Sequence, residues 1–349
     1  MWYNTHMMQR KFLLTAGAAA LAACAAVADV SNPSSSARYA TDAYPGFDRE
    51  EEIVTTGKKE PRWFSWINGP AKDNAADQLA YARACAAEGS WRAARRGYDA
   101  LVREWPTAPE APVAQEALAD LYYSHYLEFD RAFEEYRYLL DYYSLQCAYE
   151  TVAARLYETA KMMRAEGKTF MFFRFANTVD VRRAFEALVL RAPGAPYAAE
   201  AMLAVAELRE DDLEYDKAIQ VYENIRNLYA NTPEARTALV REAAARMELL
   251  RKHAYNRSRC QDTIAFLRLA LASNLDAETR DTFTADLREA VELVEDEAYR
   301  AAKFYDSRTR TKRSAIAAYE RFLKDYPASV HAPAALARLT ELQQETNEQ

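Results

Sequence analysis

Residues 89–106, which read GSWRAARRGYDALVREWP, decide the fold of this chain. Ala94, Tyr98 and Leu101 follow one another at the spacing of one helix face, and Pro106 closes the segment. A small residue lets a preceding helix approach closely, and an aromatic residue four positions later fills the space beside it. Proline ends the helix because it cannot donate the next backbone hydrogen bond. The stretch therefore predicts the second helix of a packed helix pair.

The same spacing of small and large residues returns along the chain. It recurs in four further segments and, more weakly, in a fifth: Ala132 to Tyr143, Val181 to Pro193, Ala218 to Tyr229, Ala315 to Pro327, and Thr263 to Leu271. Before each of the six segments the sequence predicts an Ala-rich amphipathic helix: residues 75–88, 113–126, 148–166, 196–210, 234–251 and 278–305.

This alternation of two helices is typical of the tetratricopeptide repeat, which is normally ~34 residues long. A generic helical bundle would share the 3.6-residue period, but the proline or chain turn that closes each segment favours the array. We therefore predict an all-α fold, an α-solenoid of about five to six tetratricopeptide-like helix-turn-helix repeats. Such an array presents a concave groove.

Composition agrees with this fold and excludes some functions. Only 8 Gly and 12 Pro occur in 349 residues, too few turn formers for a many-stranded β protein. The formal net charge of −7 argues against nucleic-acid binding, which requires a basic face. The cysteines that follow Cys24, namely Cys85, Cys147 and Cys260, lie in apolar helical contexts and are predicted to be buried free thiols.

The first residues have the features of a secretory signal. Arg10 and Lys11 precede an uncharged, Ala- and Leu-rich run that is too short and weakly apolar for a transmembrane helix. It closes with residues 21–24, LAAC, which resemble a bacterial lipobox. We predict a lipoprotein signal peptide over residues 1–23 and lipidation of Cys24. An ordinary signal peptide, with Cys24 incidental, is the alternative.

The segment after the lipobox differs from the rest of the chain. It is largely polar, contains SNPSSS at residues 31–36, and lacks apolar periodicity. Such composition is typical of disordered chain. We predict that residues 24–73 form a largely disordered tether and that residues 74–349 form the repeat domain.

The lipobox, the tether and residues 89–106 together resemble the outer-membrane protein assembly factor BamD family. Residues 117–140 resemble its second repeat, and PGAPYA at residues 193–198 is similar to the exit of its third. The match covers most of residues 75–195 and 295–345, whereas residues 205–290 hold more repeat than a five-unit member has room for. These additional residues imply a divergent member of the family with an extra repeat.

The resemblance implies a non-enzymatic lipoprotein on the periplasmic face of the outer membrane, serving as a scaffold for β-barrel assembly and insertion. Its partners would be the β-barrel assembly machinery protein and unfolded outer-membrane protein segments. Ala25 is not the Asp that commonly retains lipoproteins in the inner membrane. The alternative is a periplasmic adaptor for peptidoglycan or division proteins, or a pilotin.

Motifs for catalysis are missing from the sequence. The glycines are too widely spaced for a phosphate loop, and the four histidines have no second ligand at metal-binding spacing. Asp211 and Asp212 fall at a predicted helix-to-helix turn and are interpreted as solvated. His125 is interpreted as a packing or surface residue. We therefore expect no enzyme activity, no cofactor and no metal.

Two groups of residues remain as candidates for partner binding. Aromatic residues on the first helices of repeats suit capture of an extended peptide, although they could instead fill space between repeats. These are Tyr81, Tyr122, Tyr123 and Tyr126. A basic loop could meet an acidic partner domain or lipid headgroups, or could simply be solvated. It comprises Arg308, Arg310, Lys312 and Arg313.

Overall fold

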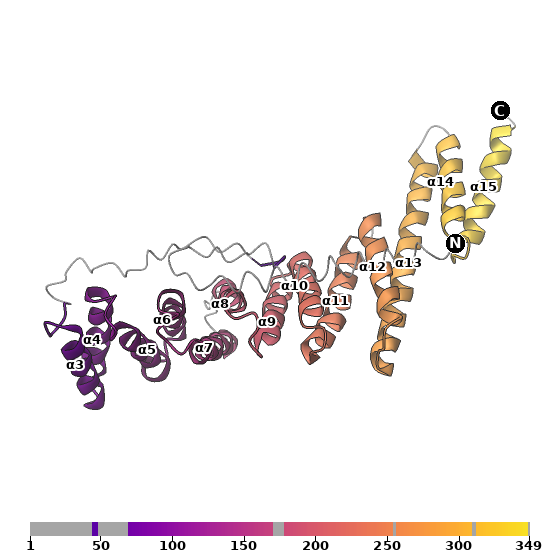
Figure 1. The fold of residues 1–349 in the computed structure, drawn as a ribbon. Coiled ribbons are helices and arrows are strands. Elements are labelled where there is room, and N and C mark those ends of the chain that lie inside the picture. Colours follow the sequence, from indigo (N-terminus) through magenta and orange to yellow (C-terminus); the bar gives the residue numbers. More distant parts are fainter. Residues whose placement is uncertain (1–43, 48–68, 170–177, 254–255, 309–311, 348–349) are drawn as a thin grey trace, which may run out of the picture. The chain divides into compact units, whose positions relative to one another are not determined.

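The computed structural model describes residues 44–47, 69–169, 178–253, 256–308 and 312–347. Within these ranges thirteen α-helices follow one another and no strand occurs (Figure 1). The predicted fold class, an all-α array of tetratricopeptide-like repeats, is confirmed. The predicted signal peptide, Cys24 and most of the predicted tether lie outside the described residues.

The described helices form six consecutive pairs along the chain, followed by one terminal helix. They are α3 (Ala75–Ala87) and α4 (Trp91–Glu104), α5 (Ala111–Leu121) and α6 (Phe129–Tyr142), α7 (Tyr149–Thr169) and α8 (Thr178–Arg191), α9 (Ala198–Asp211) and α10 (Tyr215–Leu228), α11 (Pro233–Lys252) and α12 (Arg257–Leu271), α13 (Ala277–Arg308) and α14 (Lys312–Asp325), and α15 (Ala332–Asn347). Each pair corresponds to one predicted repeat. The terminal helix α15 covers the last pair, and the repeat pattern does not predict it as a separate element.

The chain divides into two compact units. The first comprises residues 1–212 and 220–235, and the second comprises residues 213–219 and 236–349. In the first unit the helices from α3 to α8 each pack against the next one in sequence, as do α12 to α14 in the second unit. Nearest-neighbour packing of this kind is typical of repeat proteins. None of the helices in the described ranges is long and apolar enough to cross a membrane.

The small residues that mark the second helices are buried, as the repeat pattern requires. Ala94, Ala132, Ala218 and Ala315 are at most 1% exposed. The aromatic residues four positions after them are buried as well: Tyr98, Tyr136, Tyr222 and Tyr319. At these positions the second helix meets its neighbour closely.

Gly97 shows how close α4 comes to α3. A Cβ atom at this glycine would lie 2.8 Å from the Cβ of Ala82, a separation that real Cβ atoms do not reach. Gly97 therefore permits the close packing of the first pair, since any larger residue would push the helices apart.

Tyr136 and Tyr319, two of the buried tyrosines, form hydrogen bonds between helices. Tyr136 donates to Asp120 of α5, and Tyr319 donates to Asp306 of α13 at 3.3 Å, so each second helix is tied to the first helix of its own repeat. Burial, followed by the nearby Asp306 carboxylate, raises the pKa of Tyr319 to about 12.

A second set of tyrosines ties one repeat to the repeat before it. Tyr143, just after α6, donates to the carbonyl of Pro106 at 2.8 Å, and Tyr229, just after α10, donates to that of Pro193 at 2.7 Å. Both tyrosines stand eleven positions after a marker alanine, and both carbonyls lie at the end of the preceding second helix. The repeat pattern therefore supplies a hydrogen bond as well as apolar contacts.

The expected helix over residues 113–126 is wrong for its last turn. The α-helix ends at Leu121, and Tyr122–Tyr126 form a π-helix, which is closed by Leu127 in the left-handed conformation (φ 54°). The Ser124 hydroxyl donates to the carbonyl of Asp120 at 2.6 Å. This bond competes for the acceptor that an α-helical N–H would use and favours the wider turn.

Replacing Ala94 or Ala315 with Leu should destabilise the protein. Both alanines are buried between helices, so the larger side chain overpacks the contact, at a cost of roughly 1–3 kcal/mol. Thermal unfolding followed by circular dichroism measures the effect. Arg92→Leu, at an exposed position of α4, is the matched control and should leave the midpoint almost unchanged. Unchanged melting of both alanine variants would disprove the repeat register.

Candidate functional site

An aromatic cluster lies between the start of α4 and the π-helix. We define it as Trp91 and Arg95 of α4 together with Tyr122, His125 and Tyr126. The rings of Trp91 and His125 are stacked with centroids 4.5 Å apart, and His125 meets Tyr126 edge-on at 5.0 Å. The Arg95 guanidinium donates to the Tyr122 hydroxyl at 3.3 Å and lies 5.7 Å from the centre of the Tyr126 ring.

Local helix geometry brings these side chains together. Trp91 and Arg95 are four residues apart and share one face of α4. The π-helix presents Tyr122, His125 and Tyr126 to that face, with ring centroids of Tyr122 and Tyr126 5.8 Å apart. A π turn holds more residues than an α turn, and π turns often occur at functional sites.

The aromatic cluster has a buried base and an accessible rim. Tyr122 is only 8% exposed, whereas Trp91 is 37% exposed and His125 is also exposed. The hydrogen bond to Tyr122 raises the pKa of Arg95, so its guanidinium stays charged. Arg131 of α6 adds a second cation, 5.8 Å from the centre of the Tyr122 ring. Stacking rings beside cations suit binding of aromatic and anionic peptide groups.

The hydroxyl of Tyr126 is a polar group of the aromatic cluster that the described residues leave unsatisfied. It is buried, and no hydrogen-bond partner for it occurs in the part of the chain that the structure describes. A buried hydroxyl normally has a partner, since an unmade hydrogen bond is costly. A bound peptide or a water molecule would supply it.

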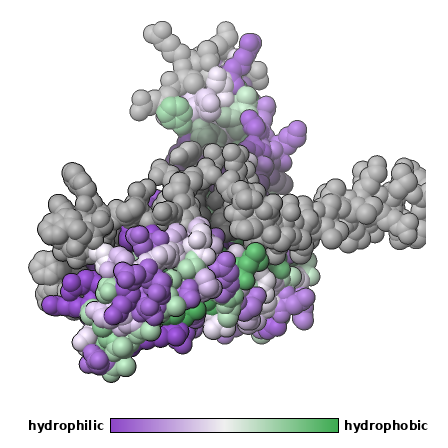
Figure 2. All heavy atoms as spheres, turned by 60° about the vertical axis from the view of Figure 1, so that its left-hand side comes forward, coloured by the Kyte–Doolittle hydropathy of each residue, from purple (hydrophilic) through white to green (hydrophobic). Residues whose placement is uncertain are grey.

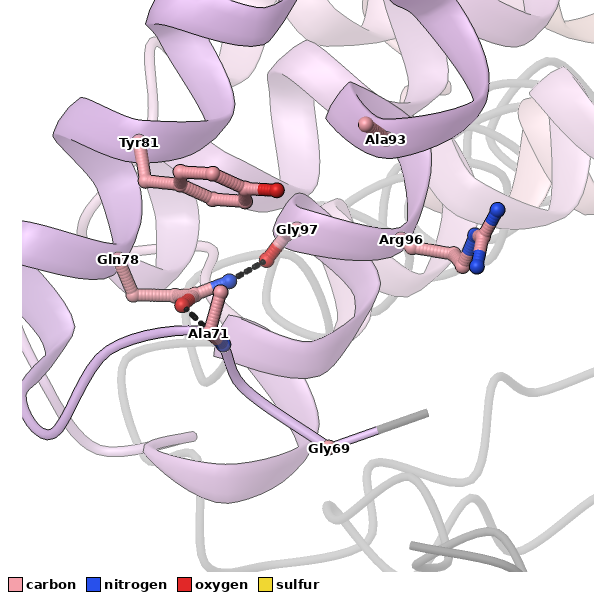
Figure 3. A pocket seen from close by; sticks show the side chains of 7 residues that line it. All are labelled: Gly69, Ala71, Gln78, Tyr81, Ala93, Arg96 and Gly97. Carbon is pink, nitrogen blue, oxygen red and sulfur yellow. Dashed lines mark hydrogen bonds between the residues drawn. The ribbon is translucent and has the colours of Figure 1, made fainter. Parts of the chain in front are cut away.

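Tyr81 lies apart from the other predicted tyrosines. It lines a shallow hollow of about 200 Å³ between α3, α4 and residues 69–71, together with Arg96 (Figure 3). Gln78 closes the hollow by donating to the carbonyl of Gly97 at 3.0 Å and accepting from the backbone N–H of Ala71 at 2.9 Å. The hollow uses the opposite side of α4 from the aromatic cluster, so Tyr81 does not extend that cluster.

The remaining predicted tyrosine, Tyr123, packs locally. Its ring meets Phe129 of α6 edge-on, with centroids 5.5 Å apart. Over the described residues on the face toward the viewer, hydrophilic side chains predominate and apolar ones are scattered (Figure 2).

The basic group is only partly available. Arg308 ends α13, and Arg310 lies outside the described residues. Lys312 begins α14, and its Nζ lies 2.8 Å from Glu345 of α15, which lowers the pKa of that carboxyl. Arg313 is exposed. The predicted basic loop thus contributes at least one cation to packing within the second unit.

Sequence reasoning missed part of the aromatic cluster. The sequence indicated Trp91 only as part of the repeat pattern, and His125 was interpreted as a packing or surface residue. It indicated no role for Arg95 or Arg131. The paired spacing of Trp91 and Arg95 on α4 is a signal that was available. Their contact with His125 and Tyr126 depends on the π turn, which helical periodicity does not indicate.

Charged side chains in the interior form ion pairs between helices. Arg209 of α9 is fully buried and donates to Glu186 of α8 at 2.9 Å. Arg191 binds Asp141 through two nitrogens, at 2.7 and 2.8 Å. Asp212, expected to be solvated, is exposed at the end of α9, but it also accepts from Arg182 of α8 at 2.7 Å. These carboxylates hold helices together.

The thiols are free among the described residues. Cys85 and Cys260 are buried, as predicted. Cys147 was expected on a helix, but it lies half-buried in the loop between α6 and α7, where residues 144–147 form turns. No group of three or more His, Cys, Asp or Glu side chains in the described ranges is arranged to hold a metal ion.

Comparisons with known proteins add structural likenesses. No protein-family model matches the sequence, and no curated protein matches it. A tetratricopeptide repeat protein from Parabacteroides merdae is 12% identical, with 77% of this chain and 98% of that chain covered and a TM-score of 0.29. Pseudomonas aeruginosa PilF is 15% identical, with coverages of 76% and 97% and a TM-score of 0.26.

PilW, a widely conserved type IV pilus biogenesis factor, is 14% identical over 76% of this chain and 100% of that chain, with a TM-score of 0.23. The fold assignment itself rests on the six helix pairs and their buried marker residues.

Replacing Arg209 with Met should strongly destabilise the protein. The change leaves Glu186 buried without Arg209, its partner on α9, and with Arg182 of its own helix at 3.8 Å, so the loss costs up to about 3–5 kcal/mol. The double variant Arg209→Met/Glu186→Leu removes both charges and should recover most of the loss. Urea unfolding measures the stability of both variants. Arg288→Met, in an exposed pair with Glu292, is the control and should have little effect. If Arg209→Met were as stable as the double variant, the buried ion pair between Arg209 and Glu186 would be contradicted.

Proposed function

We propose that this protein is a non-enzymatic scaffold that binds other proteins in the cell envelope. The aromatic cluster carries the proposal, because it combines accessible rings with fixed cations and an unsatisfied hydroxyl on a rigid pair of helices. Arrays of helix pairs stack such side chains into extended binding surfaces. Rings backed by guanidinium groups recognise peptides by stacking and hydrogen bonding.

We further propose that the scaffold is anchored by lipid on Cys24 to the periplasmic face of the outer membrane. Support comes from LAAC at residues 21–24 and from the basic and apolar segment before it. A lipid-modified cysteine that carries several acyl chains gives stable anchoring.

The specific role that we propose is in assembly and insertion of β-barrel outer-membrane proteins. The support is the resemblance of residues 75–195 and 295–345 to the BamD family. Unfolded barrel segments are rich in alternating aromatic residues, which suit the rings of Trp91 and Tyr126. The exposed Arg313 would contribute to a second surface, toward an acidic partner domain.

Removing rings from the accessible part of the aromatic cluster should weaken peptide capture. Trp91→Ala and Tyr126→Ala should each lower the affinity for a C-terminal barrel peptide at least about fivefold, as expected for contact residues of an interface. Tyr122→Phe removes only the hydroxyl that Arg95 binds and tests that hydrogen bond. The measurement is fluorescence anisotropy with the full-length protein, with circular dichroism to verify folding.

Tyr305→Ala is the matched control, since Tyr305 is an exposed aromatic residue on α13 in the other unit. It should bind the peptide as the wild type does. Pull-down of the barrel-assembly protein accompanies the assay. Failure to capture either the peptide or that protein, with retention of peptidoglycan, division or pilus proteins instead, would replace the barrel role with the adaptor or pilotin role.

Replacing Cys24 with Ser should abolish lipidation. The variant should incorporate no labelled palmitate and should move from the membrane to the soluble fraction, because acylation requires the cysteine sulfur. Cys147→Ser, at a half-buried thiol in the repeat domain, should label and fractionate as the wild type does. Palmitate labelling that persists in Cys24→Ser would refute the anchor.

A further inference from the structure

The residues Tyr44-Pro45-Gly46-Phe47 form a tight turn, which we name the YPGF turn. The N–H of Phe47 donates to the carbonyl of Tyr44 at 3.1 Å, and Gly46 has a φ of 93°. Proline in the second position and a positive-φ glycine in the third are the pattern of a type II turn. The rings of Tyr44 and Phe47 stack with centroids 5.2 Å apart. The sequence itself therefore specifies this conformation.

The YPGF turn lies against α10. Asn224 of that helix donates its side-chain N–H to the carbonyl of Pro45 at 3.0 Å, across 179 positions of the sequence. The short indigo segment in Figure 1 marks this turn. In a type II turn this carbonyl takes no part in the hydrogen bond that closes the turn, so it is free to accept from a receptor.

Burial of aromatic side chains supports the contact. Tyr44 and Phe47 are half-buried. Burial raises the pKa of Tyr44. Burial, followed by the proximity of Tyr44, raises the pKa of Tyr229, the residue that ties this repeat to Pro193. The turn thus rests on a part of the first unit that hydrogen bonds between repeats hold in place.

We propose that the surface around Asn224 and Tyr229 is a recognition site for an aromatic-Pro-Gly-aromatic turn, and that the YPGF turn of the same chain is its resident occupant. A side-chain amide can donate to a peptide carbonyl, and the half-buried aromatic rings beside it supply apolar contact area. A partner segment with the same turn competes with the YPGF turn for this site. This inference goes beyond the proposed function and does not depend on it.

The intramolecular contact has a quantitative consequence. The YPGF turn and its site belong to one chain, so the turn meets the site at an effective concentration on the order of 1 mM. A free peptide that binds the empty site with a dissociation constant of about 0.1 mM would therefore bind the occupied site about tenfold more weakly. The same peptide should reveal whether the site is occupied.

The test uses the full-length chain and a fluorescein-labelled peptide of residues 40–51. Gly46→Val in the protein disfavours the positive φ and releases the YPGF turn, because β-branched residues rarely adopt it. The peptide should bind Gly46→Val about tenfold more tightly than the wild type. Gly57→Val, the same substitution elsewhere in the segment before the repeats, is the matched control and should bind as the wild type does.

A second substitution locates the site. Adding Asn224→Ala to Gly46→Val removes the hydrogen bond to the peptide carbonyl and should weaken binding about two- to tenfold. Chymotrypsin should also cut the Phe47–Asp48 bond faster in Gly46→Val than in the wild type. The proposal would be overturned if Gly46→Val and the wild type bound the peptide equally or were cleaved equally. It would also be overturned if Asn224→Ala did not weaken binding.

Discussion

Close contact between a small residue on one helix and the helix beside it is the constraint on which this structure depends. A single helix pair cannot bury its apolar face, so each pair must pack against the next. The marker residues Ala94, Ala132, Ala218 and Ala315 are buried and allow this approach, and Gly97 allows a still closer one at the first pair. The tyrosines beside them then fill the space that the small residues leave.

Polar groups give the stacked repeats their register. Apolar contact alone tolerates small displacements, whereas a buried hydroxyl or guanidinium must find a partner at a fixed distance. Tyr143 and Tyr229 reach the end of the preceding second helix, and Arg209 reaches Glu186 on the neighbouring helix. These bonds position the surfaces that carry the aromatic cluster and the receptor for the YPGF turn.

The aromatic cluster and the YPGF turn both include backbone that departs from the regular α-helix. The aromatic cluster depends on a π turn, and the YPGF turn depends on one positive-φ glycine before the repeats begin. The amide of Asn224, by contrast, belongs to the regular helix α10 and meets the irregular turn from there. Binding at the two surfaces would remain compatible, because one uses α4 and the π-helix and the other uses α10.

The sequence by itself determined the all-α fold and nearly all helix positions, because the spacing of Ala94, Tyr98 and Leu101 reports a local, periodic requirement for burial. It also marked Tyr122 and Tyr126, but not their partners. Only the tertiary structure decided that Trp91 stacks on His125, that Tyr81 lies apart from the other tyrosines, and that Asn224 holds Pro45. These contacts join segments far apart in the chain or follow a non-periodic turn, and periodicity carries no information about either.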